Sequence, residues 1–552
     1  MTETTELADE LFELVMATDP LEATLYGIAG HDDRLPDVSE RGQAALRAAA
    51  EDIAARARAL PDTDPVTRAV VVHTAESIVD LVSTRSAEYT ITGSFFAPAG
   101  ALLTILPMIT VSTPEQQRDY LLRLAAIPGF LAVLTERHRT GLAAGRLPVA
   151  HLVRSAVEFV DRYLAAPPSA DPLGRFEGTP EFAAERDRLL AEAVRPAYAA
   201  YRDVLEREML PAGRPEGRPG LCWLPDGAAI YTALARVHTT TSRTPEDLHE
   251  TGLALIAGLA EEYVELGRRV FGTEDLAEVF DRMRTDPALR WRDAEEMITA
   301  ARDVVARAEA VAPEWFGTLP TSSCVVSAVP EAEAPGAPTA YYSPTAMDGS
   351  RPGTYYANTS RAQERYRYQS EAIAFHEAVP GHHFQITLAQ ELTDLPMLRR
   401  LANVTAYAEG WGLYCERLAD EMGLYSDDVA RLGMLSTDSM RAGRLVVDTG
   451  LHALGWSRAQ AIDYLRENTP LALVEIESEV DRYIAAPGQA LSYMVGRLEI
   501  QRIRAEAEAT AGEGFDIRAF HDVVLGGGAL PLAVLDQVVS AWAASTTVPA
   551  SA

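Results

Sequence analysis

Helical periodicity runs through most of this sequence and constrains its fold more than any other feature. From Thr5 to about residue 310, apolar residues recur at spacings of three and four in segments rich in Ala, Leu, Glu and Arg. The pattern resumes near Gln363 and continues, with loops, to about Ser545. Because this spacing is typical of amphipathic helices, we expect a mainly α-helical fold.

One helix can be placed from its first residues. Thr244 is suited to cap a helix, Pro245 follows at the first helical position, and Asp247 is placed to reach back to the cap. The pattern predicts a long helix that ends at about Val270.

Residues 320–360 interrupt the helical pattern and predict a small sheet. Three short segments there are β-branched or aromatic and are bounded by Pro and Gly, at 323–329, 339–342 and 354–358. The sheet lies just before a cluster of histidines in the sequence, and an edge strand of it would bind an extended peptide by strand addition. We interpret residues 1–310 as a helical lobe and 311–552 as a catalytic lobe, the two forming one continuous catalytic unit.

Charge and composition exclude several functions. The chain carries 80 acidic and 49 basic side chains, a net charge of -31, which argues against nucleic acid and membranes as partners. Lysine is absent from the sequence, which excludes Schiff-base catalysis and phosphate binding by a lysine. The three cysteines are too few for a disulfide framework, and the first residues do not resemble a signal peptide. We therefore expect a cytoplasmic protein, of an oligomeric state that the sequence does not indicate.

Three of the eleven histidines lie within eight residues, in His376-Glu377-Ala-Val-Pro380-Gly-His382-His383. A helical segment precedes them. In a His-Glu-x-x-His helix, the histidines at i and i+4 lie on one face and bind zinc at about 2.0–2.1 Å. Here the residue at i+4 is Pro380.

Pro380 changes the path that the helix can take. On an unbroken helix His382 would lie about 120° around from His376, and His383 would lie ~10 Å further along the axis. The proline ring collides with the carbonyl of His376, four residues back, so the helix must break or bulge. If two residues are looped out, His382 becomes the second ligand. Glu377 then points at the metal-bound water as general base.

Two carboxylates on the next helical segment complete the constellation. Glu409 and Glu416 are seven residues apart and share one face, and Glu409 is flanked by Tyr407 and Trp411, which do not fit a solvent face. We expect Glu409 to be the third ligand of one Zn²⁺ ion. Glu416 would orient a ligand histidine through its other ring nitrogen.

The sequence around His376 closely resembles the signature of a bacterial family named domain of unknown function 885. The resemblance covers nearly the whole chain and includes further segments at 21–28, 348–358, 487–493, 520–525 and 528–532. It implies membership of the gluzincin peptidases, with a two-lobed helical fold and a deep cleft, similar to the carboxypeptidase Taq family and angiotensin-converting enzyme. A Gly-His pair shared with those families favours His382 as second ligand, with His383 as the alternative.

Peptide hydrolysis also needs a hydrogen-bond donor for the oxyanion. In related gluzincins a tyrosine from the C-terminal region plays this part, which implies Tyr493. His521 is a second candidate, and Gln489, one helical turn before Tyr493, would share its cleft face. Further substrate-binding candidates are two tyrosines that would line the cleft from the edge strand, Tyr355 and Tyr356, and three arginines that would anchor a carboxylate, Arg351, Arg482 and Arg497.

Three functions are compatible with these residues. The first is a zinc metallopeptidase that acts on short peptides as a carboxypeptidase or dipeptidase does. The second is a metal-dependent hydrolase of a non-peptide amide or an amino-acid conjugate. The third is a catalytically silent binding protein on a peptidase scaffold, against which the intact Glu377 argues, since metal binding alone does not require it.

Overall fold

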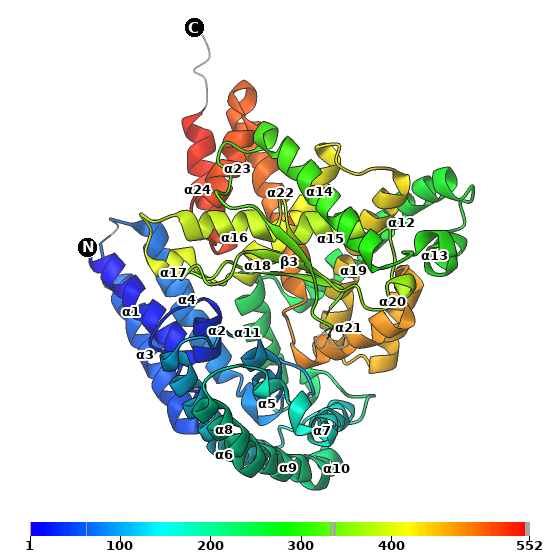
Figure 1. Cartoon of the computed structure of the whole chain (residues 1–552). Coiled ribbons are helices and arrows are strands. Elements are labelled where there is room, and N and C mark those ends of the chain that lie inside the picture. Colours follow the sequence, from blue (N-terminus) through cyan, green and yellow to red (C-terminus); the bar gives the residue numbers. More distant parts are fainter. Residues whose placement is uncertain (1, 62, 332–333, 335–337, 547–552) are drawn as a thin grey trace.

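The computed structural model describes residues 2–61, 63–331, 334 and 338–546. About 70% of the chain is helical, which confirms the predicted mainly α fold (Figure 1). The helices before the sheet are α1 (Glu3–Thr18), α2 (Pro20–Leu25), α3 (Glu40–Ala59), α4 (Pro65–Ser83), α5 (Pro98–Ile105), α6 (Pro114–Ala143), α7 (Ala150–Ala165), α8 (Pro180–Leu189), α9 (Arg195–Val204), α10 (Leu210–Ala212), α11 (Gly227–Thr239), α12 (Pro245–Val270), α13 (Leu276–Thr285) and α14 (Ala294–Trp315).

The helices after the sheet carry the predicted site. They are α15 (Ser370–Glu377), α16 (His382–Glu391), α17 (Met397–Arg400), α18 (Thr405–Glu421), α19 (Asp428–His452), α20 (Arg458–Asn468), α21 (Leu473–Ala485), α22 (Leu491–Ala511), α23 (Ile517–Leu525) and α24 (Leu532–Ser545).

Helix α12 has the boundaries that its sequence predicts. The Thr244 side chain accepts a hydrogen bond from the Asp247 N–H, Pro245 is the first helical residue, and the helix ends at Val270. The Asp247 carboxylate bonds Arg243 instead of reaching back to the cap. Local capping rules therefore place both ends of this helix correctly.

The predicted sheet is present, and its strand order corrects one detail. Strands β1 (Val325–Ala328), β2 (Ala340–Ser343) and β3 (Thr354–Ala357) are arranged β1-β3-β2, with β1 parallel and β2 antiparallel to β3. Tyr355 and Tyr356 therefore lie on the central strand, not on an edge. Tyr355 is buried, and Tyr356 stacks on Tyr341 with ring centroids 5.1 Å apart. The edge strand that adjoins α15 is β2.

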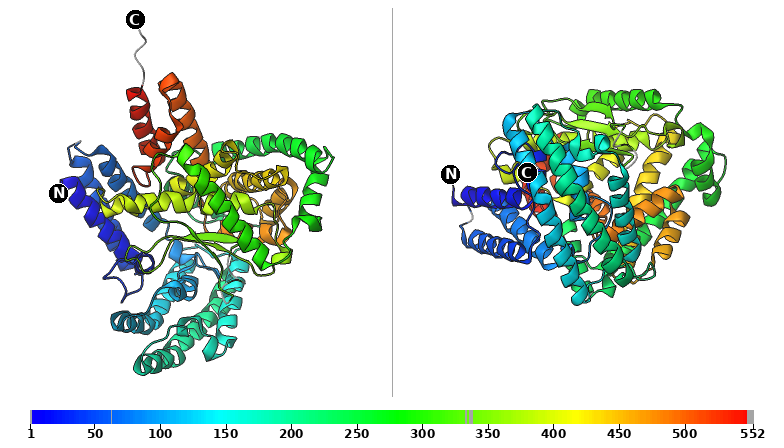
Figure 2. Two further views of the ribbon diagram at one scale, coloured as in Figure 1. Left: turned by 45° about the horizontal axis from the view of Figure 1, so that its top comes forward. Right: turned by 60° about the horizontal axis from the view of Figure 1, so that its bottom comes forward.

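Buried apolar side chains connect the two predicted lobes. The main core includes residues from Leu7 to Ala543, on both sides of residue 310. A second core is formed by residues between Leu21 and Met209. Figures 1 and 2 show helices α6 to α10, which supply much of it, gathered at one end of the molecule. The main core thus contains side chains from both predicted lobes.

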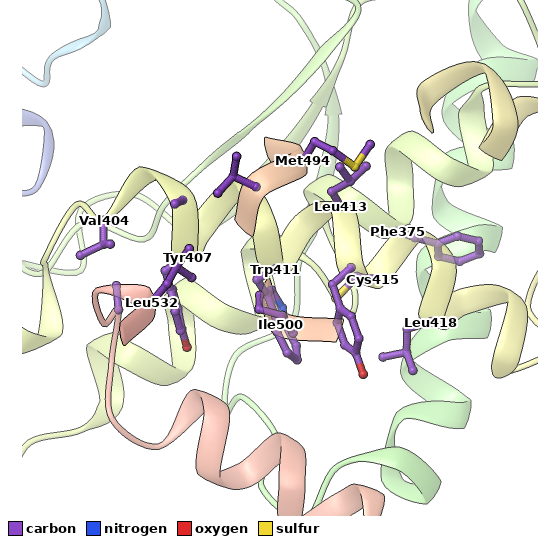
Figure 3. Close-up of a cluster of buried hydrophobic side chains, with 14 of the residues drawn as sticks. Phe375, Val404, Tyr407, Trp411, Leu413, Cys415, Leu418, Met494, Ile500 and Leu532 are labelled. Carbon is purple, nitrogen blue, oxygen red and sulfur yellow. The ribbon is translucent and has the colours of Figure 1, made fainter. Parts of the chain in front are cut away.

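Helix α18 lies at the centre of the main core. Figure 3 shows its side chains Tyr407, Trp411 and Leu418 packed with Phe375 of α15 and Ile500 of α22. Helices α18 and α22 approach closely at two glycines, since a Cβ atom on Gly496 would lie 2.7 Å from the Cα of Gly410. This packing fixes α18, from which the predicted carboxylates project.

Candidate metal centre

The helix is interrupted between His376 and His382, as the position of Pro380 predicts. Helix α15 ends at Glu377 and α16 begins at His382, with a cis Val379–Pro380 peptide bond in the turn. The turn is tight, because a Cβ atom on Gly381 would lie 1.9 Å from the carbonyl oxygen of His376. Glycine is needed at this position for space. The two histidines therefore come from the end of one helix and the start of the next.

Helix α18 holds this turn in place. The indole N–H of Trp411 donates a hydrogen bond of 2.9 Å to the carbonyl oxygen of Pro380. The thiol of Cys415, one helical turn later, donates to the same oxygen at 3.4 Å. Both side chains are buried, so these bonds connect α18 rigidly to the break between α15 and α16.

The break brings His376, His382 and Glu409 together. The Nε2 atom of each histidine lies 3.4 Å from Oε2 of Glu409, and one donor atom of each residue lies within 4.8 Å of the others. The edge of a tetrahedron around zinc, with ligands at about 2.0–2.1 Å, is about 3.4 Å long. Two of the three donor separations match that edge, and the set of two imidazoles and a carboxylate suits zinc. These three residues therefore fit a zinc ion.

A buried carboxylate orients the first histidine. Nδ1 of His376 donates to Oε1 of Glu416 at 2.8 Å, and the other oxygen of Glu416 accepts from the hydroxyl of Thr437 on α19. Glu416 is fully buried. With Nδ1 protonated, Nε2 is the nitrogen that faces Glu409 and is free to coordinate a metal. Burial alone would lower the pKa of His376, but hydrogen bonds with Glu409 and Glu416 outweigh it and raise the pKa to about 9.

Close packing on α18 sets the position of the His376 ring. A Cβ atom on Gly412 would lie 2.7 Å from the ring carbon Cε1 of His376. Any side chain there would displace the ring. Since residues 409, 412 and 416 recur at helical spacing, one face of α18 provides a ligand, a gap and an orienting carboxylate.

Glu377 lies beside the group and is held by the sheet. Its Oε2 accepts a hydrogen bond of 2.9 Å from the backbone N–H of Tyr342 on β2. Burial raises the pKa of Glu377, against the opposing charges of His376, His382 and Arg441. With one oxygen held by β2, the other is available for proton transfer.

Tyr493 projects from α22 and stacks beside His376. Its ring is nearly parallel to that of His376, at 21°, with centroids 6.2 Å apart. Burial raises the pKa of Tyr493, so its hydroxyl keeps its proton at neutral pH and can donate a hydrogen bond. Arg444 projects from the neighbouring helix α19. Its guanidinium carbon lies 4.4 Å from the centroid of the Tyr493 ring.

Comparison with known proteins places the chain in a family. A family model described as "Bacterial protein of unknown function (DUF885)" matches residues 20–539. The chain belongs to this family. No curated protein sequence matches it significantly.

Two solved structures share the fold of this DUF885 protein. One is the "putative lipoprotein" from Colwellia psychrerythraea, which is 27% identical over 98% of this chain and 99% of its own, with a TM-score of 0.91. The other, from Shewanella oneidensis, is described as a "putative lipoprotein of unknown function". It is 17% identical over 98% of this chain and 100% of its own, with a TM-score of 0.75. Among the described residues of the present chain, no helix is both long and apolar enough to cross a membrane.

Two of the histidines predicted for the site face elsewhere. His383 donates from Nε2 to the carbonyl of Ser322 and accepts at Nδ1 from the hydroxyl of Tyr342, at 3.0 Å each. With both nitrogens engaged, it does not join the ligand group, so the alternative assignment of His383 is not supported.

The proposed role of His521 as oxyanion donor is also corrected. His521 is fully buried, with Nδ1 bonded to the Trp315 carbonyl and Nε2 to the Tyr414 hydroxyl, at 2.9 Å each. Burial lowers its pKa to about 3. It lies against Trp411 and Tyr414, on the face of α18 opposite Glu409, and cannot reach the site.

The three predicted carboxylate anchors have different surroundings. Arg497 is buried and bonds Asp438, so its charge is already paired. Arg351 bonds Ser343 and the carbonyl of Leu25 and lines a separate cavity of about 480 Å³. Arg482 donates to Oε1 of Gln489 at 3.0 Å and lies within electrostatic range of Tyr493.

Sequence reasoning missed residues whose roles depend on tertiary contacts. The backbone N–H of Tyr342 and the absent side chain of Gly412 leave no local signal. Thr437 is one polar residue in a long buried helix. Arg441 and Arg444 lie among both apolar and polar residues in segment 432–452, so their burial also left no local signal.

Proposed function

We propose that this DUF885 protein is a zinc-dependent metallopeptidase that hydrolyses short peptides and is related to the gluzincins. The observation that carries the proposal is the convergence of His376, His382 and Glu409 from three helices, with Glu416 behind His376. A helix break at Pro380 and a glycine at 412 both serve this convergence. A surface cluster of charges would need neither.

The chemistry divides between the metal and the protein. A zinc ion at this centre would supply a Lewis acid that polarises the substrate carbonyl and lowers the pKa of water to about 7. Glu377 would take a proton from the attacking water and deliver it to the leaving amine. Its raised pKa suits both steps, because a group that accepts and returns a proton works best with a pKa near the working pH.

The remaining side chains would bind and orient. The Tyr493 hydroxyl would donate a hydrogen bond to the oxygen that gains charge as water attacks, and such donors contribute about 10²–10³ in rate. Strand β2 would present its outer edge to an extended substrate, although the N–H of Tyr342 is already bonded to Glu377. The deep cleft between two lobes and the cytoplasmic location remain parts of this proposal.

The test combines metal analysis with a digest of a peptide library read by mass spectrometry. We expect the wild-type protein to bind about one zinc ion and to cleave short peptides. Glu377→Gln should keep the zinc and lose about 10²–10⁴-fold in rate, since a general base contributes that much.

Glu371→Gln is the matched control. Glu371 lies on the same helix but pairs with Arg307 and the backbone of Ser426, so the substitution should leave the rate unchanged. Cleavage by Glu377→Gln at the wild-type rate would refute the mechanism. Zinc binding with hydrolysis of amides other than peptides would instead support a hydrolase of amino-acid conjugates.

A further inference from the structure

Arg441 is a buried charge without a partner. Its side chain projects from α19, and the residue is 9% exposed. Among the residues that the structure describes, it makes no ion pair or hydrogen bond, and its Nε is buried without a partner. Its guanidinium carbon lies 5.6 Å from the centroid of the Tyr493 ring. Burial of an unpaired charge is costly, so such a group points to a missing anion.

A second guanidinium lies next to the same tyrosine, and a third lies within electrostatic range of it. Arg444 is 4.4 Å from the Tyr493 ring centroid, and Arg482 acts on the Tyr493 hydroxyl by its charge. Arg444 and Arg482 share a single carboxylate, that of Glu479, at 2.8 and 3.3 Å. Burial alone would raise the pKa of Glu479, but these two arginines hold it well below its usual range.

The cluster carries more positive than negative charge. Each of its three arginines has a buried nitrogen without a hydrogen-bond partner among the described residues, namely Nε of Arg441, Nη1 of Arg444 and Nε of Arg482. Asp448 lies within electrostatic range of Arg482, but its carboxylate accepts hydrogen bonds from Tyr231 and the backbone of Gly488. Burial raises the pKa of Asp448 to about 7, so at neutral pH it compensates only part of the charge.

The cluster adjoins the metal centre. The centroid of the Tyr493 ring lies 6.2 Å from that of His376, and the guanidinium carbons of Arg441 and Arg444 lie 5.6 and 4.4 Å from the same centroid. Tyr493 therefore bridges His376 and the two guanidiniums, which limits how far apart they can lie. Arg441 also acts by its charge on Glu377. A substrate at the metal centre would therefore extend toward this cluster.

We infer that Arg441, with Arg444 and Arg482 beside it, binds the C-terminal carboxylate of the substrate, so that the protein removes residues from the free C-terminus of a peptide. Paired guanidiniums are suited to a carboxylate, which accepts several charge-assisted hydrogen bonds. A residue of extended chain spans about 3.3–3.6 Å. The short path from His376 to Arg441 thus fits one or two residues after the cleaved bond. This inference rests on the proposed peptidase activity for its substrate, but the anion site can be tested apart from it.

The first test compares peptides of one sequence that differ at the C-terminus. The free acid should be hydrolysed about 10- to 100-fold faster than the C-terminal amide, since hydrogen bonds to charged groups contribute that much. Mass spectrometry should detect release of one or two residues. Arg441→Met should reduce the ratio of the rate on the acid to the rate on the amide by a similar factor, whereas Arg292→Met at an exposed position should leave this ratio unchanged.

Two results in that series would overturn the inference. One is equal rates of wild type on the acid and the amide, a comparison that needs no variant to fold. The other is an amidated peptide that ends in glutamate and is cleaved as fast as the free acid, which would assign the cluster to side-chain carboxylates.

The second test measures binding without turnover. N-acetylphenylalanine and its amide are titrated into zinc-loaded wild type, Arg441→Lys and Arg441→Met by calorimetry. We expect binding of the acid to be strongest in wild type, weaker in Arg441→Lys and lost in Arg441→Met, with the amide binding weakly throughout. Equal binding of acid and amide, or no binding of the acid, would overturn the inference. Binding of the acid without hydrolysis of any peptide would refute the peptidase proposal and leave the anion site standing.

Discussion

His376 and His521 lie on opposite faces of helix α18, and the two are buried to a similar degree. His376 is 4% exposed at its side chain and contacts two carboxylates, Glu409 and Glu416. His521 contacts a hydroxyl and a carbonyl, those of Tyr414 and Trp315. The pKa of the first is raised to about 9 and that of the second is lowered to about 3.

The difference shows that burial does not decide what a histidine does in this fold. Burial lowers the pKa of both side chains, and negative neighbours reverse the effect at His376 alone. A neutral imidazole with both nitrogens engaged stabilises packing. An imidazole that is oriented by one carboxylate and faces another is suited to a cation, whether a proton or a metal ion.

Among the predicted effects, the largest should be the loss of zinc binding when one of the proposed metal ligands is removed. His382→Ala should abolish zinc binding in metal analysis, with a loss larger than the about 10- to 100-fold that an outer partner contributes. His383→Ala, at the adjacent position, should keep the zinc and lose about 1–3 kcal/mol of unfolding free energy, because Tyr342 and Ser322 lose their partner. The opposite pattern, with zinc lost only in His383→Ala, would show that the ligand assignment is wrong.

Loss of the orienting carboxylate should give an intermediate effect. Glu416→Gln keeps the shape of the side chain but removes the charge that holds Nδ1 of His376. Zinc affinity should fall by about 10- to 100-fold in competition with a chelator. Glu421→Gln on the same helix, where the carboxylate forms an exposed pair with Arg504, serves as control. Equal affinities of the two variants would mean that Glu416 does not tune the site.

The smallest effect should be the pH dependence of stability at His521. Since its pKa is about 3 in the folded protein and about 6.5 when unfolded, the unfolded state binds a proton that the folded state excludes between those values. His521 therefore contributes stability above about pH 6.5, and this is lost by about 1.4 kcal/mol per pH unit as the pH falls toward 3.

A comparison of variants isolates this contribution. His521→Phe removes the titrating group, so its unfolding free energy should fall less steeply than that of wild type between pH 6 and 4 in chemical denaturation. Zinc content at pH 7 should not change. Identical slopes for the two proteins would indicate that His521 is protonated in the folded state.

Local sequence signals predicted much of the fold and the three residues that lie together at the candidate metal centre. The helical class, the ends of α12, the three strands and the break at Pro380 follow from capping, periodicity and proline geometry, which act over a few residues. The pairing of His376 with His382 follows from that break. These predictions needed no knowledge of distant contacts.

The remaining features depend on contacts between distant segments. The sequence could not place β3 between β1 and β2, because strand order is set by packing after the chain folds back. The sequence alone makes His521 a plausible donor, and only the position of α23 in the fold places it against Tyr414. Arg497 and Arg441 are equally isolated in sequence, and only the position of Asp438 distinguishes a paired arginine from an unpaired one.

Helix α19 contributes to two sites from one rigid segment. Thr437 supports Glu416 behind the metal centre, and Arg441 lies four residues later, which is about 6 Å along a helix axis. In the proposed peptidase, the interval between the cleaved bond and the recognised carboxylate would thus depend on the spacing of residues along a rigid helix. A family member with one residue inserted between these positions would turn its arginine by about 100° and would need a different means of measuring substrate length.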